Sequence, residues 1–366
     1  MPVSYMEINL SALRHNLREI RHHLPDKVNI LAVVKANGYG HGASETLRIA
    51  LQEGYVGAAV ARVEEGKELR EAGFTCPIYV LGIPLHDDML IGVKYDLILP
   101  VDDTTDLDAL ENIAKGAGKV MEVMMPVDTG MNRIGTHPED VKPFLHQLKE
   151  YPHLHLRGTW THMATADCRD KSAALKQLER FNEAVAQMPV DDTFVVSAAN
   201  SAGIIDIPES WHNLARPGII IYGPQPSDEM EHTLDLQYVM RIVSHVTHVQ
   251  TLHKGEAIGY GGTFVADEDM MTATVPIGYA DGYPRCLSNK GAVLIGGKRC
   301  PILGRICMDQ FMVRVDDTVK PGDEVILMGR QGNGEITLDE VAKAAGTIPH
   351  EITCDLKRIP RVFIEK

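Results

Sequence analysis

The stretch Ala32-Val33-Val34-Lys35-Ala36-Asn37-Gly38-Tyr39-Gly40-His41-Gly42 decides how the rest of the chain is interpreted. An apolar, β-branched run, residues 28–34, predicts a short buried strand that ends at a lysine. A lysine beside apolar walls is rare unless its amine is paired or used in chemistry, because burial lowers the amine pKa. A neutral amine can react with an aldehyde to form a Schiff base. The glycines that follow let backbone approach a ligand closely, and Tyr39 adds a hydroxyl.

Length and composition limit the class of protein. The chain has 366 residues, 44% of them hydrophobic, and a formal net charge of −14. About two domains are expected at this length. The acidic balance argues against a nucleic-acid partner, which would need a basic face. There is no run of about 18 apolar residues, so we expect no membrane span, and the first residues lack the pattern of a signal peptide.

The cysteines point to a reducing compartment. Six of them are scattered along the chain without a C-x-x-C pair. This spacing predicts free thiols rather than a disulfide framework or a zinc site. We therefore expect a cytoplasmic protein without a bound metal.

Strands and helices alternate through the first two thirds of the chain. A strand is expected at residues 3–8, followed by an amphipathic helix capped by Ser11. Further strand candidates lie near residues 28–34, 56–61, 77–81, 95–99, 119–126, 154–160, 193–197 and 212–216. Helical patterns between them include 63–72, 105–114, 138–149 and 171–187. Eight such repeats predict an α/β fold, a (β/α)8 TIM-like barrel, with an open doubly wound sheet as the competing arrangement.

A second domain follows a proline-broken linker at residues 224–229. Beyond it, apolar strands are separated by glycine and aspartate turns, with one expected helix at 338–345. We therefore predict a barrel domain at 1–230 and a mainly β domain at 231–366. The strand at 3–8 can pair with the second domain.

Residues with polar side chains or free backbone amides follow several of the predicted barrel strands, where a barrel places its active site. They are Lys35 after the first strand, Arg133 after the fifth, His162 after the sixth, Asn200 and Ser201 after the seventh, and Arg216, Gly218 and Ile219 after the eighth. Each alone has a simple structural explanation, such as a surface arginine or a capping serine. Their occurrence together at one rim of the barrel predicts a ligand site. The loops after the last two strands commonly bind phosphate, which makes Ser201, Gly218 and Ile219 candidate anion ligands.

The segment Lys35–Gly42, KANGYGHG, resembles the pyridoxal-phosphate lysine motif of the alanine racemase family. Segments NSAG at 200–203, ARPGI at 215–219, IGYGGTF at 258–264 and GRICMDQ at 304–310 also resemble family motifs, so the resemblance covers nearly the whole chain. It implies that the cofactor is pyridoxal 5′-phosphate. Lys35 would tether it, and Tyr39, Asn200, Ser201, Gly218 and Ile219 would hold it. Arg216 would face the pyridine nitrogen, oriented by His162.

The resemblance also implies the reaction, the interconversion of L-alanine and D-alanine that supplies D-alanine for peptidoglycan. Lys35 and Tyr260 would be bases on opposite faces of the substrate. Arg133 and the Met308 amide would bind the substrate carboxylate, with Asp309 in support. In the family, the tyrosine and methionine come from the other subunit, so a homodimer with shared active sites is implied. Arg216 keeps its proton, which leaves the cofactor ring a weak electron sink suited to racemisation.

Three positions depart from the family pattern. Pro126 stands where many members carry a carbamylated lysine, Asn132 replaces a glycine, and His350 replaces a tyrosine near the entrance. An anion or Asn132 would then have to position Arg133. These departures leave a racemase of serine or another small amino acid as an alternative. A pyridoxal-phosphate decarboxylase and a non-catalytic carrier of the cofactor are further alternatives.

Overall fold

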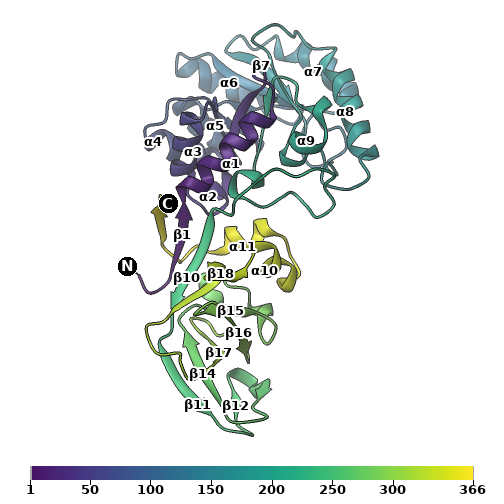
Figure 1. Ribbon diagram of the computed structural model, residues 1–366. Helices are drawn as coiled ribbons and strands as arrows, with labels where there is room; N and C mark the ends of the chain where they lie inside the picture. Colours follow the sequence, from purple (N-terminus) through teal and green to yellow (C-terminus); the bar gives the residue numbers. More distant parts are fainter. Residues whose placement is uncertain (1, 366) are drawn as a thin grey trace.

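The computed structural model describes residues 2–365. Figure 1 shows an elongated molecule in which an α/β body lies above a mainly β body, with both chain ends near their junction. This architecture confirms the predicted α/β barrel followed by a mainly β part. No helix within residues 2–365 combines the length and apolar character needed to span a membrane.

Eight parallel strands form the barrel, in two runs of four with the orders β4-β3-β2-β9 and β5-β6-β7-β8. They are β2 (Asn29–Val33), β3 (Gly57–Val60), β4 (Ile78–Val80), β5 (Leu99–Pro100), β6 (Met121–Pro126), β7 (Leu154–Trp160), β8 (Val195–Ser197) and β9 (Leu214–Ala215). The first of these strands, β2, pairs with both β3 and β9, the last. A parallel bridge between Tyr79 and Ile98 joins the two runs. A first strand that pairs with the last excludes the open doubly wound sheet.

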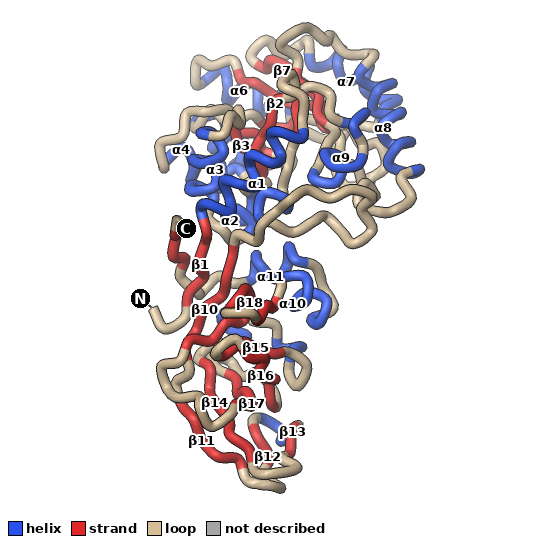
Figure 2. Tube along the Cα trace, viewed as in Figure 1, coloured by secondary structure: helices blue, strands red, loops and turns tan. Residues whose placement is uncertain are grey.

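Helices connect the barrel strands and cover them from outside (Figure 2). They are α2 (Lys35–Tyr39), α3 (Ala43–Gln52), α4 (Val63–Glu71), α5 (His86–Lys94), α6 (Leu107–Gly116), α7 (Val141–Leu148), α8 (Ser172–Val185) and α9 (Ser201–Asp206). The predicted helices at 63–72, 105–114, 138–149 and 171–187 agree with α4, α6, α7 and α8 within a few residues. A short 3-10 turn, Pro138–Asp140, precedes α7.

Before the barrel, β1 (Tyr5–Asn9) runs directly into α1 (Leu10–His23). The prediction that Ser11 caps α1 was wrong, because the cap is Asn9. Its side chain accepts hydrogen bonds from the amides of Ser11, at 3.0 Å, and Ala12, at 3.1 Å. Asn9 has the extended backbone that a cap position needs, and asparagine caps as well as serine does.

The β body is built on a large, mostly antiparallel sheet. Its strands are β10 (Met240–His245), β11 (His248–Leu252), β14 (Met270–Val275), β15 (Ala292–Ile295), β16 (Lys298–Leu303), β17 (Phe311–Val315), β18 (Glu324–Gln331), β19 (Gly334–Ile336) and β20 (Arg361–Ile364), with a separate hairpin of β12 (Ala257–Ile258) and β13 (Phe264–Val265). Strand β1 joins this sheet, antiparallel to β10 and parallel to β20. The sheet thus takes strands from both ends of the chain, and a division at 230/231 stays a prediction.

Two helices of the β body, α10 (Leu338–Ala345) and α11 (Pro349–Asp355), lie beneath the barrel (Figure 1). The predicted helix at 338–345 is α10. Helix α11 packs against the α2 turn, and a Cβ atom built on Gly40 would lie 2.1 Å from the Thr353 carbonyl oxygen. The α2 turn therefore lies between its own barrel and the β body, at the rim where the active site was predicted.

Candidate active site

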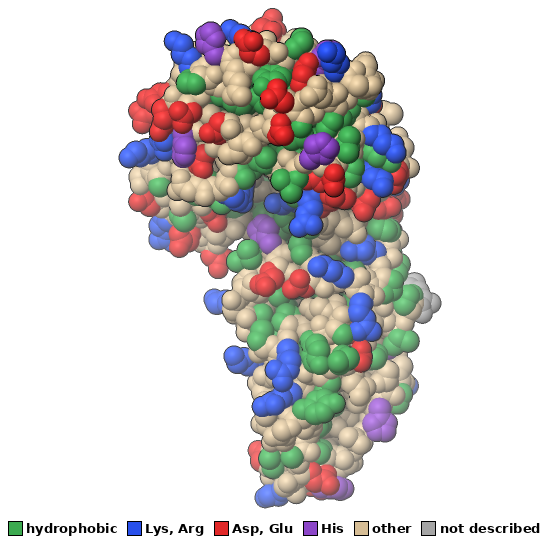
Figure 3. Space-filling model, turned by 180° about the vertical axis from the view of Figure 1, so that it is seen from behind, with side chains coloured by type: hydrophobic (Ala, Val, Ile, Leu, Met, Phe, Trp, Pro, Cys, Tyr) green, Lys and Arg blue, Asp and Glu red, His purple; other side chains and the backbone are tan. Residues whose placement is uncertain are grey.

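A cavity of about 660 Å³ lies at the carboxyl ends of the barrel strands. It is lined by nine of the predicted site residues, Lys35, Tyr39, Arg133, His162, Asn200, Ser201, Arg216, Gly218 and Ile219. Trp160, Asp167, Ile348 and His350 line it as well. Figure 3 shows the surface hollowed where the barrel meets the β body, with basic and histidine side chains gathered there. The rim residues that the sequence singled out thus share one cavity.

Lys35 directly follows β2 and opens a turn with an uncommon backbone. Residues Ala36, Asn37, Gly38 and Tyr39 have φ angles of 51°, 53°, 63° and 51°, so the chain is left-handed over four consecutive residues. The left-handed conformation costs about 1–2 kcal/mol for each residue other than glycine. Such a backbone persists only where its surroundings hold it, and strain of this kind gathers at functional sites.

The Lys35 amine lies in an environment that favours its neutral form. The side chain is half-buried, and Nζ lies 5.8 Å from the centre of the Tyr39 ring. Burial lowers the pKa of Lys35, and the Arg133 guanidinium lowers it further. A larger neutral fraction makes the amine a better nucleophile and a better base.

Tyr39, Ser201 and Gly218 converge on one side of the cavity. The Gly218 amide donates a hydrogen bond to Ser201 Oγ over 2.9 Å. A Cβ atom at Gly218 would lie 2.5 Å from the Tyr39 hydroxyl oxygen. Burial raises the pKa of Tyr39, so its hydroxyl keeps its proton and can donate a hydrogen bond to an anion. Ile219 follows at the start of a 3-10 turn, Ile219–Tyr222.

Asn200 supports this corner through hydrogen bonds to the backbone. Its Oδ1 accepts from the Gly203 amide at 3.0 Å and thereby caps α9. Its Nδ2 donates to the Met163 carbonyl at 3.3 Å. The side chain thus fixes the start of α9, where Ser201 lies, and a direct contact of Asn200 with a cofactor stays a prediction.

Arg216 is buried at 5% exposure and is held by three groups. One terminal nitrogen donates to the Thr161 carbonyl at 2.7 Å and the other to Ser197 Oγ. The guanidinium also lies 5.3 Å from the centre of the Trp160 ring. Burial lowers its pKa to about 10, so Arg216 remains charged at neutral pH. Sequence reasoning missed Ser197, Thr161 and Trp160, although all three stand at the ends of predicted strands.

His162 lies in the same cavity as Arg216 but is uncharged. Burial lowers its pKa to about 3, with further lowering by Arg216, Arg133 and Lys35. The hydrogen bonds of Arg216 described above go to Ser197 and Thr161, so an orienting role for His162 stays a prediction.

The loop that carries Arg133 is held by a carboxylate. Asp128 Oδ1 accepts hydrogen bonds from the amides of Gly130, at 2.9 Å, and Asn132, at 3.0 Å. At the loop's base, the Pro126 carbonyl accepts from the Thr136 amide at 3.0 Å. Asn132 has φ +54°, a conformation that asparagine tolerates better than most residues other than glycine. Asparagine can therefore replace a glycine here.

His350 reaches the cavity from α11. Its ring centre lies 5.7 Å from that of Tyr39. Among the described residues, its buried Nδ1 has no hydrogen-bond partner. Burial lowers the pKa of His350, as does the Lys35 charge. A buried nitrogen without a partner beside a cavity suits a site that binds a polar group.

The predicted site residues of the β body lie outside this cavity. Tyr260 is 71% exposed and Met308 is 54% exposed. Asp309 forms a surface ion pair with Arg358 at 3.2 Å. Within one chain, the structure does not bring Tyr260, Met308 or Asp309 to Lys35.

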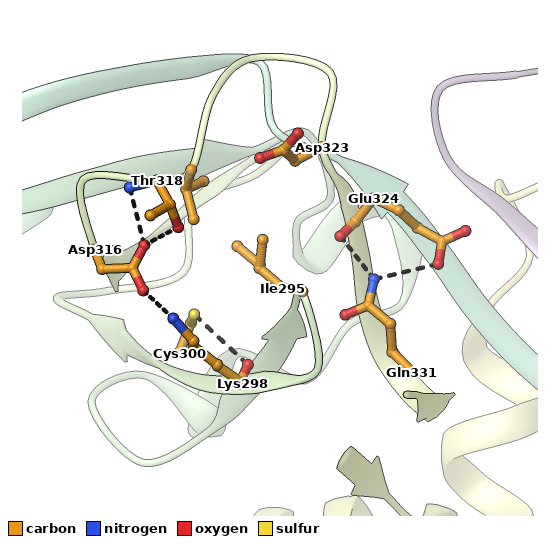
Figure 4. A pocket seen from close by; sticks show the side chains of 10 residues that line it. Ile295, Lys298, Cys300, Asp316, Thr318, Asp323, Glu324 and Gln331 are labelled. Carbon is orange, nitrogen blue, oxygen red and sulfur yellow. Dashed lines mark hydrogen bonds and ion pairs between the residues drawn. The ribbon is translucent and has the colours of Figure 1, made fainter. Parts of the chain in front are cut away.

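A second pocket, of about 310 Å³, lies within the β body (Figure 4). Lys298 pairs with Asp316 at 2.6 Å, and Gln331 donates to the Glu324 carbonyl at 3.1 Å. Its polar side chains therefore satisfy one another, and the reactive groups gather in the barrel cavity instead.

Known proteins resemble the chain along its whole length. Family models described as "Alanine racemase, N-terminal domain" and "Alanine racemase, C-terminal domain" match residues 8–226 and 239–363. The chain is 42% identical to an alanine racemase of Desulforamulus reducens, over 98% of each chain. An alanine racemase of Bacillus anthracis with bound L-Ala-P superposes with a TM-score of 0.95, at 37% identity, covering 100% of this chain and 96% of the other. One from Bartonella henselae with covalently bound pyridoxal phosphate has a TM-score of 0.89, at 30% identity, over all of both chains.

Proposed function

The chain belongs to the alanine racemase family, and from this premise we propose that Lys35 and Tyr260 are the two bases that move the α-proton of alanine. The reaction is that of an isomerase, which interconverts L-alanine and D-alanine. One observation carries the proposal: the Lys35 amine shares a cavity with Arg133, Arg216 and the hydroxyls of Tyr39 and Ser201.

The residues of the cavity fit pyridoxal phosphate, which the relative from B. henselae holds covalently. Lys35 would tether it. The hydroxyls of Tyr39 and Ser201 would hold its phosphate beside Gly218, at a place that a Cβ atom would fill. The unpartnered His350 nitrogen and the amides of Ile219 and Gly218, the latter bonded to Ser201 Oγ in this structure, would add further polar contacts. When bound, the cofactor supplies an electron-withdrawing ring that makes the α-proton of an attached amino acid acidic.

Arg216 would limit that withdrawal of electrons. Its buried guanidinium stays charged, so it would donate a hydrogen bond toward the ring nitrogen without giving up a proton. Ser197 and the Thr161 carbonyl hold it in place, and the neutral His162 lies nearby. This arrangement would favour return of the proton to the α-carbon over transfer of the amino group.

Arg133 would bind the substrate carboxylate, because a guanidinium matches a carboxylate in charge and geometry. The relative from B. anthracis binds L-Ala-P, a small amino-acid ligand. We assign the positioning of Arg133 to the Asp128 carboxylate, which holds the loop through two amides.

Tyr260 must come from elsewhere, because within the described chain it lies outside the cavity. We therefore propose a head-to-tail homodimer in which Tyr260, the Met308 amide and Asp309 complete the other subunit's site. The exposure of Tyr260 and Met308 supports this arrangement. The Arg305 guanidinium lies beside Gly261, the residue after Tyr260, where a Cβ atom would meet it at 3.2 Å.

The product fits a biosynthetic role inside the cell. We propose that the enzyme works in the cytoplasm, where its six free cysteines suit a reducing environment, and that its D-alanine supplies peptidoglycan. Turnover of serine or another small amino acid is the alternative, favoured by the His350 nitrogen that lies unpartnered beside the cavity.

Single enantiomers of alanine in D2O test the reaction. We expect loss of optical rotation together with exchange of the α-proton, and loss of both in Lys35→Ala and Tyr260→Phe. Mixing these two inactive variants tests the shared site, because a mixed dimer would contain one site with both bases intact. Activity should therefore return on mixing. Failure of activity to return would exclude shared sites, and an active Lys35→Ala protein would overturn the whole proposal.

A further inference from the structure

One carboxylate beside the turn that carries Lys35 has three backbone partners. Glu65, near the start of α4, accepts hydrogen bonds through Oε2 from the amides of Ala61, at 2.7 Å, and Arg62, at 3.1 Å. These two bonds cap α4. The third bond is different, because Glu65 Oε1 accepts from the Ala36 amide at 2.5 Å. Ala36 belongs to another strand–helix unit and is the residue after Lys35.

Ala36 is the first residue of the left-handed turn. Further along, the turn is held by the Ala36 carbonyl, which accepts from the Gly40 amide at 3.0 Å, and by Asn37 Oδ1, which accepts from the Ala43 amide at 2.9 Å. Both of these contacts lie within the turn or directly after it. The Glu65 bond ties the start of the turn to the end of β3, a different part of the barrel.

We propose that Glu65 is a positioning residue for Lys35, holding the strained turn at Ala36 so that the lysine side chain projects into the cavity. This inference rests on the proposed role of Lys35. Capping of α4 alone explains the bonds to Ala61 and Arg62, but it does not explain why one oxygen turns to Ala36.

Glu65 also contributes charge. Its carboxylate raises the pKa of Lys35, opposing burial and Arg133, which lower it. The other titratable groups that interact with Lys35 are Cys354 and His350 on α11, His162 after β7, and Tyr39 on α2. Arg133, Glu65 and Cys354 lie on three different elements, so removal of Glu65 alone leaves the other charges in place.

The test compares Glu65→Gln with Glu64→Gln in the full-length holoenzyme. Glu64 is the exposed neighbour on the same helix and is a matched control for loss of one negative charge. Glutamine keeps the length of the side chain, but its amide nitrogen cannot accept a hydrogen bond, so either the Ala36 bond or the capping bonds are lost. We expect kcat to fall by about tenfold to hundredfold, as for a misplaced reacting group, with a smaller change in KM.

A spectroscopic readout separates positioning from general loss of structure. The absorbance of the bound cofactor changes when the nitrogen contributed by Lys35 gains a proton. The midpoint pH of this absorbance change should be lower in Glu65→Gln, because the negative charge that stabilises the protonated nitrogen is gone. The midpoint should be unchanged in Glu64→Gln. Glu65→Asp keeps the charge on a shorter side chain, so it should keep the midpoint near that of the unmodified protein while kcat falls.

Each outcome decides the proposal. If Glu65→Gln matches Glu64→Gln in kcat and midpoint, Glu65 is a helix cap only. If Glu65→Gln does not fold, Glu65→Asp tests the proposal instead. An unchanged kcat in Glu65→Asp would show that Glu65 does not position Lys35. Failure of the proposed function is recognised separately, because Lys35→Ala would then retain the cofactor's absorbance and activity.

Discussion

The Tyr39 hydroxyl lies against Gly218, so close that a Cβ atom there would come within 2.5 Å of the phenol oxygen. The two residues follow the first and the last barrel strands along the chain, Tyr39 after β2 and Gly218 after β9. Because these strands are paired neighbours, closing the barrel creates the contact. The Gly218 amide bonds the Ser201 hydroxyl at the same point. The proposed phosphate pocket thus depends on a position with no side chain.

Gly218→Ala should weaken cofactor binding. The added Cβ atom would crowd the Tyr39 hydroxyl. Displacing the hydroxyl should raise the Kd for pyridoxal phosphate by about tenfold, equivalent to about 1.4 kcal/mol. Fluorescence titration measures it, with Gly116→Ala as control, since a Cβ atom at Gly116 meets nothing within 4 Å. Equal Kd values in the two variants would show that Tyr39 can move aside freely.

The barrel could be predicted because its strands are short β-branched runs separated by regular helical patterns. The expected strand at 119–126 ends at the same residue as β6, Met121–Pro126. Predicting where a strand ends in turn predicts which residues lie at the rim of the barrel. Strand β16 was not predicted, since Pro301 interrupts its alternation, and β20 has only four residues. Helix α11 begins with a proline and has few apolar residues to reveal a period.

The site shows a different limit of sequence reasoning. Lys35 and Arg216 lie in short sequence motifs that can be recognised. The residues that hydrogen-bond these motifs in the fold cannot be recognised in the same way. Ser197 bonds Arg216 across 19 positions, and Glu65 bonds Ala36 across 29. No periodicity or composition marks such pairs, because the packing of neighbouring barrel strands brings them together. The partner of Tyr260 is harder still to predict from the sequence, since its proposed contact with the active site requires a second chain.

Ser197→Ala should loosen Arg216 and destabilise the fold. Ser197 Oγ donates to the Leu214 carbonyl at 2.6 Å and accepts from Arg216. Removing the oxygen leaves two buried groups each short of a partner, which costs about 1–3 kcal/mol. Urea denaturation measures the free energy of unfolding. A loss below about 0.5 kcal/mol, as for a surface substitution, would mean that Arg216 is held adequately by Thr161 and Trp160.

Acid should destabilise the protein through His41. This side chain is 1% exposed, stacks on Tyr222 with ring centres 4.5 Å apart, and has a pKa lowered by burial to about 4. The unfolded chain binds this proton with a pKa near 6.5, so stability is complete above that value and falls as pH drops toward 4. At pH 5 the loss should be about 2 kcal/mol relative to pH 8.

Urea denaturation across this pH range measures that loss. His41→Gln should show a shallower decline between pH 7 and pH 5, although its stability at neutral pH is lower. His146→Gln, at an exposed position, serves as the control. If His41→Gln and the unmodified protein decline in parallel, other groups control the acid sensitivity.

The Arg133 loop should tolerate only residues that accept a left-handed backbone at position 132. Asn132 has φ +54°, and its amide bonds Asp128 Oδ1. Asn132→Gly should keep the free energy of unfolding within about 0.5 kcal/mol, because glycine adopts this conformation without strain. Asn132→Val should lose about 1–2 kcal/mol, because a β-branched side chain resists positive φ. It should also raise KM for alanine, since Arg133 is the next residue and its guanidinium would shift. If Asn132→Val and Asn132→Gly had the same KM and stability, the backbone at position 132 would not position Arg133, and the loop would be held by the Pro126–Thr136 contact instead.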